Sequence, residues 1–232
     1  MKKLLGLLCV TILFGLAGLA EATTLIDIYQ GGTLLGSVTP YTGLITGAAN
    51  YNFYSDSGHP INGPEPVFKE GEIFFYDGSD GLNFNVIFSK EGIGGAAGSA
   101  QWDITITGST TNLSVRVTDD ASELRENVTT HVFTGRWGWN NQNTDGGVIG
   151  EIGGSEWIIT IDPIAYSLDN LKAYSASGSS YALNLNTDAS GDIILKPASS
   201  PVPVPATILL FCSGFLGLLG IGGIKKERKD NT

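Results

Sequence analysis

The sequence predicts an all-β fold, an antiparallel β-sandwich with a jelly-roll-like topology, and three observations lead to this prediction. Apolar and polar residues alternate through the middle of the chain, which is the period of a half-buried strand. Clusters of Gly, Ser, Asp and Asn interrupt these stretches at spacings of roughly 8 to 15 residues. The chain shows no internal repeat of fixed period, which disfavours a propeller or a solenoid.

The first element is a predicted signal peptide over residues 1–22. Lys2 and Lys3 precede an apolar stretch over residues 4–19, and residues 20–22 have the small-x-small pattern of a signal peptidase site. Cys9 lies too deep in the apolar stretch to follow a lipoprotein cleavage site. We therefore expect plain export and a mature chain that begins at Thr23.

The strands are predicted from alternation over residues 101–108, 112–118 and 156–162. In each stretch every second residue is apolar, and these residues should share one face that packs into the core. They are Trp102, Ile104, Ile106, Leu113, Val115, Val117, Trp157, Ile159 and Ile161. Residues 72–77 and 82–88 flank a Gly-Ser-Asp-Gly turn and predict a hairpin with a loop of four or five residues.

Two segments do not follow the strand pattern. Residues 48–66 are rich in Asn, Gly and Pro and are predicted to form a long loop, a type of segment that either connects strands or binds ligands. Residues 120–128 are the one candidate for a short helical turn, with Asp119 or Asp120 as its cap and with Glu123 and Glu126 exposed.

Charge and cysteine content exclude several classes of protein. The ectodomain, residues 23–200, contains 20 of the 23 acidic and seven of the 13 basic residues, which gives a net charge near −13. Such a surface repels nucleic acid and anionic lipid, so no nucleic-acid partner is expected. Both cysteines, Cys9 and Cys212, lie outside this segment, so neither a disulfide nor a thiolate metal site is expected in it.

The strongest candidate for ligand binding is the segment that begins Arg-Trp-Gly-Trp at residue 136. Trp137 and Trp139 should point to the same side of a strand, and Asn141 and Asp145 follow within a run of amides. Flat aromatic faces beside amides and a carboxylate are the combination that proteins use to bind sugars. The alternative is that the two rings pack in the core and that the amides form a turn, and this alternative is favoured.

A calcium site is the second candidate. Asp77 and Asp80, and further on Asn143 and Asp145, place oxygen ligands on Gly-containing turns. Neither stretch matches a known calcium-loop pattern, and Asp-Gly turns also arise from backbone geometry alone. No cofactor is therefore assigned, and calcium remains open.

An enzyme is not expected. The chain has two histidines: His59, in the predicted loop, and His131, in an apparent strand; two are too few for a histidine-rich metal centre. The stretch around Ser155 lacks the second Gly of a nucleophile elbow. A glycosidase pair of carboxylates could still form among the 20 acids, since its members need no fixed sequence spacing.

The C-terminal segment, residues 201–232, has three parts. Val202, Pro203, Val204, Pro205 and Ala206 precede an apolar run that extends to residue 224, and the cluster Lys225, Lys226, Arg228 and Lys229 follows. The run would form a helix of roughly 28 Å, close to the thickness of a membrane core, with the basic cluster on the cytoplasmic side. The same pattern is compatible with an ordinary membrane anchor.

This segment resembles the PEP-CTERM class of sorting signals, and most closely the VPLPA-type subgroup, although Val204 stands where the subgroup has Leu. The resemblance implies an exosortase as processing partner in the inner membrane of a Gram-negative bacterium that makes exopolysaccharide. It also implies a transient anchor, removal of the tail, and release to the cell surface or extracellular matrix.

Three hypotheses follow for the function. The first is a non-enzymatic surface or matrix protein that associates with exopolysaccharide in a biofilm. The second is a carbohydrate-binding module that uses Trp137 and Trp139, which requires exposed rings. The third is a polysaccharide hydrolase or lyase, which requires a cleft with converging acids and a Tyr, Arg or His.

Overall fold

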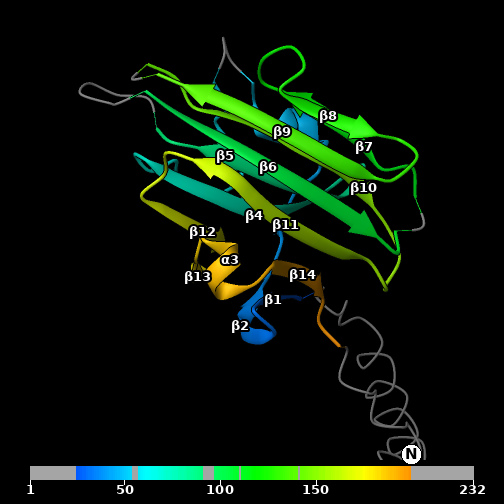
Figure 1. The fold of residues 1–232 in the computed structure, drawn as a ribbon. Helices are drawn as coiled ribbons and strands as arrows, with labels where there is room; N and C mark the ends of the chain where they lie inside the picture. Colours follow the sequence, from blue (N-terminus) through cyan, green and yellow to red (C-terminus); the bar gives the residue numbers. More distant parts are fainter. Residues whose placement is uncertain (1–24, 54–56, 91–96, 110, 141, 200–232) are drawn as a thin grey trace, which may run out of the picture. The chain divides into compact units, whose positions relative to one another are not determined.

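The structure is a computed structural model that describes residues 25–199 except 54–56, 91–96, 110 and 141. The described residues up to Ala198 belong to one compact unit, built of strands and two short helices, α2 (Gly47–Tyr51) and α3 (Thr187–Ser190) (Figure 1). The predicted signal peptide, residues 1–22, and the sorting signal, residues 201–232, lie outside the described residues. Within the described part, neither helix has the length or hydrophobicity needed to cross a bilayer.

Sheet A has seven strands, and each neighbouring pair is antiparallel. Its spatial order is β2 (Thr33–Val38), β1 (Ile26–Gln30), β14 (Ile193–Pro197), β11 (Ile158–Tyr166), β6 (Gly98–Thr107), β9 (Val132–Trp139) and β8 (Leu124–Asn127). Strands from both ends of the described chain therefore meet in one sheet, where β1 pairs with β14.

Sheet B also has seven strands but is mixed. Its main order is β13 (Ser180–Leu183), β12 (Asn170–Tyr174), β4 (Glu70–Gly78), β5 (Gly81–Phe88), β10 (Asp145–Ile152) and β7 (Ser114–Thr118). The seventh strand, β3 (Tyr41–Thr42), and β12 each run parallel to β4. The prediction of a purely antiparallel sandwich is wrong at these two pairs, because both strands reach β4 through long connections and not through hairpins.

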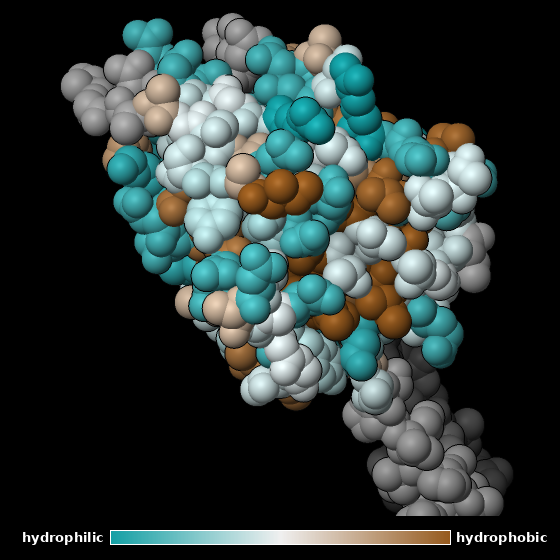
Figure 2. Space-filling view, viewed as in Figure 1, coloured by the Kyte–Doolittle hydropathy of each residue, from teal (hydrophilic) through white to brown (hydrophobic). Residues whose placement is uncertain are grey.

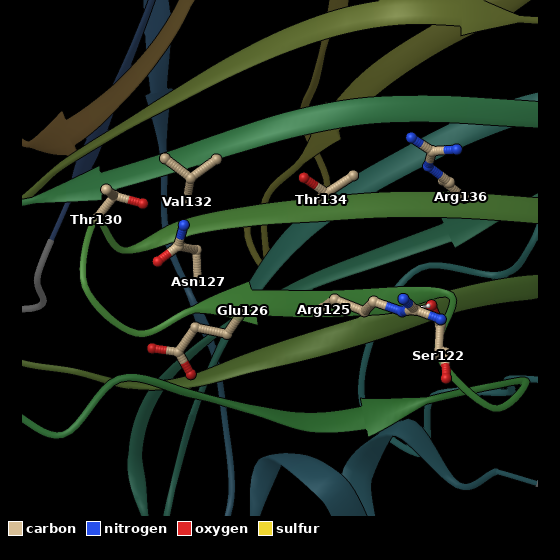
Figure 3. Close-up of a pocket in the computed structure, with 8 residues that line it drawn as sticks. All are labelled: Ser122, Arg125, Glu126, Asn127, Thr130, Val132, Thr134 and Arg136. Carbon is tan, nitrogen blue, oxygen red and sulfur yellow. Dashed lines mark hydrogen bonds between the residues drawn. The ribbon is translucent and has the colours of Figure 1, made fainter.

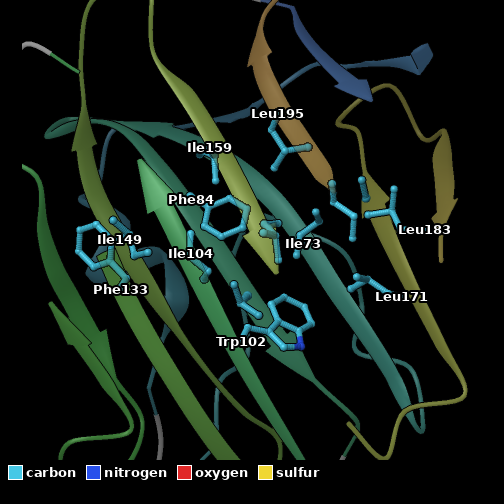
Figure 4. Close-up of a cluster of buried hydrophobic side chains, with 14 of the residues drawn as sticks. Ile73, Phe84, Trp102, Ile104, Phe133, Ile149, Ile159, Leu171, Leu183 and Leu195 are labelled. Atoms are coloured by element: carbon cyan, nitrogen blue, oxygen red, sulfur yellow. The ribbon is translucent and has the colours of Figure 1, made fainter. Parts of the chain in front are cut away.

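The core lies between the two sheets. Buried side chains from β4 and β5 of sheet B face those from β6, β9, β11 and β14 of sheet A, and Figure 4 shows a part of this layer. Phe88 of sheet B, for example, meets Trp102 of sheet A edge to face at 4.8 Å between ring centroids. The predicted all-β sandwich of two packed sheets is therefore confirmed.

The two outer faces differ. The described part of the segment 43–69, including α2, packs over β4, β5, β7 and β10 on the outer face of sheet B, where Tyr51 joins Phe74, Ile87 and Val148 in a second buried cluster. The outer face of sheet A remains exposed at alternate residues of its strands. Figure 1 shows β6, β9 and β11 in front of sheet B, and Figure 2 shows hydrophilic residues interspersed with small hydrophobic groups on this side.

The predicted strands with inward Trp and Ile residues are found as β6 and β11, and Trp157 is buried just before β11 begins. The prediction for residues 112–118 is correct only in part. In β7 the pairing with β10 skips Arg116, so Val115 packs into the core between the sheets while Val117 packs into the outer cluster. This bulge moves the two valines to opposite faces.

Three other predictions need correction. The hairpin of β4 and β5 has a loop of two residues, since Gly78 pairs with Gly81. Residues 124–127 form strand β8 and not a helical turn, because Leu124 is buried and pairs with Gly135. The segment over residues 48–66 is a loop in most of its described part, but it begins with α2, which Thr46 caps.

Candidate functional site

The two tryptophans predicted to bind sugar lie in the core. Trp137 is 2% and Trp139 is 3% exposed, and both rings pack on Phe88, at 4.8 and 5.7 Å between centroids. The Trp137 indole N–H donates to the carbonyl of Gly146 at 3.0 Å. The sugar-binding prediction for these rings is therefore wrong, and the alternative of core packing is confirmed.

Glycines beside the two rings explain why both fit between the sheets. Gly135, on the same strand, and Gly98, on β6, leave the space that the indoles of Trp137 and Trp139 occupy, because a Cβ at either position would overlap a ring. This small-residue pattern is a sequence signal for burial that the alternation of the tryptophans alone does not give. Asn141 of the same predicted site lies outside the described residues.

Asp145, the fourth residue of the predicted sugar site, is 3% exposed and belongs to a pair of carboxyl groups. Its two oxygens accept hydrogen bonds from the backbone N–H groups of Gly138 and Gly146, both at 2.6 Å. Burial, and then the neighbouring charge of Glu123, raise the pKa of Asp145 to about 9. The pKa of Glu123 is also raised, chiefly by its own burial.

Asp145 and Glu123 form a pair of neighbouring carboxyl groups. The side chains of Asp145 and Glu123 interact, and the raised pKa of Asp145, about 9, means that this carboxyl group holds a proton at neutral pH. Glycosidase carboxyl groups stand about 5 Å or more apart to leave room for the sugar or a water. Beside the pair, the buried Tyr51 hydroxyl donates to Asp119 at 3.2 Å, and burial raises the pKa of Tyr51.

A second acidic cluster, around Glu70 and Glu72, lies under the segment that covers sheet B, and no motif in the sequence indicates it. Glu70 accepts a hydrogen bond from the Tyr174 hydroxyl at 2.5 Å and forms an ion pair with Lys172 at 2.6 Å. Glu72 is 1% exposed and accepts a hydrogen bond from the Val67 N–H at 2.6 Å. Burial, and to a lesser extent the Glu70 charge, raise the pKa of Glu72 to about 8.

In the turns considered for calcium, side-chain oxygens accept hydrogen bonds from the protein's own N–H groups. Both Asp80 oxygens accept from the Gly47 N–H, at 2.9 and 3.1 Å, and one also accepts from the Asn83 amide. The Asn143 side chain accepts from the Asn140 N–H at 2.7 Å. Across the described ranges, no three Asp, Glu, His or Cys side chains come together as a metal site.

The two histidines lie in different segments of the described fold. His131 lies in the turn before β9, with φ at 51°, and not within a strand as predicted. Its ring lies 3.5 Å from the Glu126 carboxylate. The His59 N–H donates to the Tyr51 carbonyl, within the segment that covers sheet B.

The outer face of sheet A contains an open hollow of about 660 Å³ along β8 and β9, which we call the arginine hollow (Figure 3). Arg125 pairs with Thr134 across the two strands, and Arg136 is two residues further along β9 on the same face. Figure 3 shows both guanidinium groups toward the end that contains Ser122. The lining residues are Ser122, Arg125, Glu126, Asn127, Thr130, Val132, Thr134 and Arg136.

The sequence patterns do not predict this hollow, because its residues fall in a predicted helical turn and in a strand considered for its tryptophans. Pairing of β8 with β9 brings Arg125 and Arg136 onto one surface. Comparison of the chain with known protein families, curated proteins and solved structures finds no match.

Proposed function

We propose that this protein is an exported surface or extracellular-matrix protein, not an enzyme, that associates with exopolysaccharide and is processed at its C-terminal sorting signal. The observation that carries the proposal is the order of residues 201–232: a Pro-x-Pro motif, an uncharged apolar run and a basic cluster. The processing partner would be an exosortase-type enzyme of the inner membrane. The mature protein would then reach the cell surface or matrix of a Gram-negative bacterium.

The sandwich supports this role. A scaffold without cysteine, held by a packed layer between two sheets, needs no oxidative folding outside the cell. Repeated crossings of the chain between sheets A and B, from β5 to β6 and again from β10 to β11, favour the jelly-roll assignment. The exposed face of sheet A offers a broad polar surface for contact with a hydrated matrix.

Fractionation of the native host tests the proposal. We expect the protein in the extracellular or surface fraction, with a C-terminus near Pro203-Val204-Pro205 as measured by mass spectrometry of the intact chain. Replacement of Pro203 and Pro205 by Ala should retain the full-length chain in the inner membrane. Pro201→Ala, just outside the motif, is the matched control and should be processed normally.

Recovery of only full-length wild-type protein from the membrane fraction would contradict the proposal and support the plain membrane anchor. Equal processing of the Pro203→Ala/Pro205→Ala variant and the control would show that this motif is not the signal.

A further inference from the structure

In the described structure, the arginine hollow brings together two arginines that form no ion pair with an acid. Residues 23–200 contain seven basic residues, and in the described structure three of them, Lys69, Arg116 and Lys172, form ion pairs with acids. Lys196 lies 4.5 Å from the centre of the Tyr29 ring. Of the other three, Arg125 and Arg136 share one hollow, and neither has a carboxylate within 4 Å among the described residues.

Arg125 is held in place for binding. Its Nε–H donates to the Ser122 carbonyl at 2.9 Å, which fixes the side chain and leaves its two terminal amino groups for another acceptor. Residues that lie diagonally across an antiparallel pair, as Arg125 and Arg136 do, have Cβ atoms within about 8 Å of each other. Two arginine side chains whose Cβ atoms are this close are long enough to reach one carboxylate together, each through charge-assisted hydrogen bonds.

The rest of the hollow is polar and mainly uncharged. Asn127 accepts from the Thr129 N–H through its oxygen, so its amide nitrogen remains a donor, and the hydroxyl of Thr130 is exposed beside it. The Thr134 hydroxyl donates to Asp103 at 3.0 Å. The one acid of the lining, Glu126, faces His131 at 3.5 Å and has a side chain that is only 13% exposed.

These groups match an acidic sugar better than a bare anion. A hollow of about 660 Å³ lies within the usual range of small-molecule sites, roughly 300 to 1,000 Å³, and is far larger than a phosphate or a carboxylate needs. Amide and hydroxyl groups beside the arginines provide partners for sugar hydroxyls. On a domain with a net charge near −13, a local pair of unpaired cations also gives charge complementarity to an anionic chain.

We propose that the arginine hollow binds a uronic acid unit of an acidic polysaccharide, with Arg125 and Arg136 on its carboxylate and with Asn127 and Thr130 near its hydroxyls. This proposal rests on the proposed function, because the polysaccharide association comes from the sorting signal. It names the chemical class of the partner and places the contact on the open face of sheet A.

Calorimetric titration of the full-length protein in mild detergent tests the proposal. The probes are hexamers of galacturonic, glucuronic, mannuronic and guluronic acid, and for any hexamer that binds, its carboxyl-reduced, neutral counterpart. We expect at least one uronate hexamer to bind, its neutral counterpart to bind at least about tenfold more weakly, and the affinity to fall as salt rises.

Variants locate the contact. Arg125→Gln and Arg136→Gln should each weaken uronate binding about tenfold, and the double variant should abolish it, because each removes charge-assisted hydrogen bonds. Lys90→Gln removes one exposed positive charge outside the hollow and should leave the affinity within about twofold of the wild type. Melting temperatures within about 2 °C of the wild type should show that all variants are folded, since these side chains are exposed.

Several outcomes would overturn the proposal. They are the absence of binding by all four uronate hexamers, equal binding of the neutral counterpart, an equal loss with Lys90→Gln, or full competition by millimolar inorganic phosphate, which would indicate a simple anion site. None of them depends on whether the tail is cleaved. A processed protein that binds no uronate would retain the proposed function without this site, and an unprocessed protein that binds would retain the site alone.

Discussion

The two outer faces of this sandwich differ in their exposure to water. On sheet A, strands β6 and β9 alternate between buried and more exposed residues, so the outward side chains remain in contact with water. On sheet B, most of β4 and β5 is buried on both faces, because residues 43–69 cover the outer one. Two sheets that share a core thus present one open and one closed surface.

This difference bears on where burial raises the pKa of a side chain. The cover over sheet B isolates Glu72 from water, and burial raises the pKa of this residue. A strongly shifted pKa often marks an active site, but here it accompanies a packed cover. The open face of sheet A contains Arg125 and Arg136, neither of which has a carboxylate within 4 Å among the described residues, so a surface suited to binding need not contain a strongly shifted acid.

The largest test of the comparison uses the same residue on the two faces. Ile87 of β5 is fully buried beneath the cover, whereas Ile158 of β11 is 38% exposed on sheet A. We expect Ile87→Ala to lower the free energy of unfolding by about 3 kcal/mol, through lost burial and a new cavity. Ile158→Ala should lower it by less than about 1 kcal/mol, and urea denaturation measures both.

The pair also tests whether the cover is part of the folded core. Equal losses for Ile87→Ala and Ile158→Ala would mean that residues 43–69 do not seal sheet B in solution. A loss at Ile87 accompanied by a changed denaturant slope would indicate that the cover unfolds separately from the sandwich.

Local sequence patterns predicted the strands well, but they did not predict which strands pair when these are far apart in the chain. Alternation identified β6 and β11, because each has one face in the core and one in water. It could not show that β12 and β3 run parallel to β4, since nothing local encodes a crossover. The bulge at Arg116 also escaped the pattern, because one extra residue reverses the faces without changing the composition.

Candidate sites were less predictable than strands. Alternating tryptophans on a strand have the same spacing whether they face sugar or core, and only the glycines at 98 and 135 distinguish the cases. The arginine hollow depends on the register between β8 and β9. The helical turn predicted for residues 120–128 contains no such pairing, so the hollow could not be predicted from it. In the strand that does form, Leu124 is buried, so tertiary packing outweighed the local capping signal.

A smaller effect than that of Ile87→Ala should come from the ionisation of Glu72, which lies under the cover of sheet B. The folded-state pKa of Glu72 is about 8, above its ordinary value of 4.5, so the folded protein retains a proton that the unfolded chain releases between these values. The contribution of this group to stability is therefore greatest below pH 4.5 and falls as pH rises to about 8. Glu72→Gln should remove this loss.

The measurement is the free energy of unfolding at pH 6 and pH 8 for the wild type and for Glu72→Gln. We expect the wild type to lose about 2 kcal/mol more than the variant between the two pH values. The Gln oxygen still accepts from the Val67 N–H, and Thr105→Ser, on the half-exposed face of sheet A, is the control that should leave the pH slope unchanged. Parallel slopes for wild type and Glu72→Gln would show that Glu72 ionises normally and that the cover admits water.

The smallest effect compares two tyrosine hydroxyls. The Tyr51 hydroxyl is fully buried under the cover and donates to Asp119 at 3.2 Å, whereas Tyr29 on sheet A is half-buried and its hydroxyl lies 3.4 Å from Asp27. Tyr51→Phe should cost about 1 kcal/mol, because a buried acceptor loses one of its bonds in a medium without water. Tyr29→Phe should cost less than about 0.5 kcal/mol, because water replaces the hydroxyl and the ring remains under Lys196. Both changes remove a single oxygen atom. The difference between the two losses of stability, measured by denaturation at pH 6, therefore reflects the surroundings of each hydroxyl. Costs of the same size would remove the distinction between the closed and the open face at the level of individual hydrogen bonds.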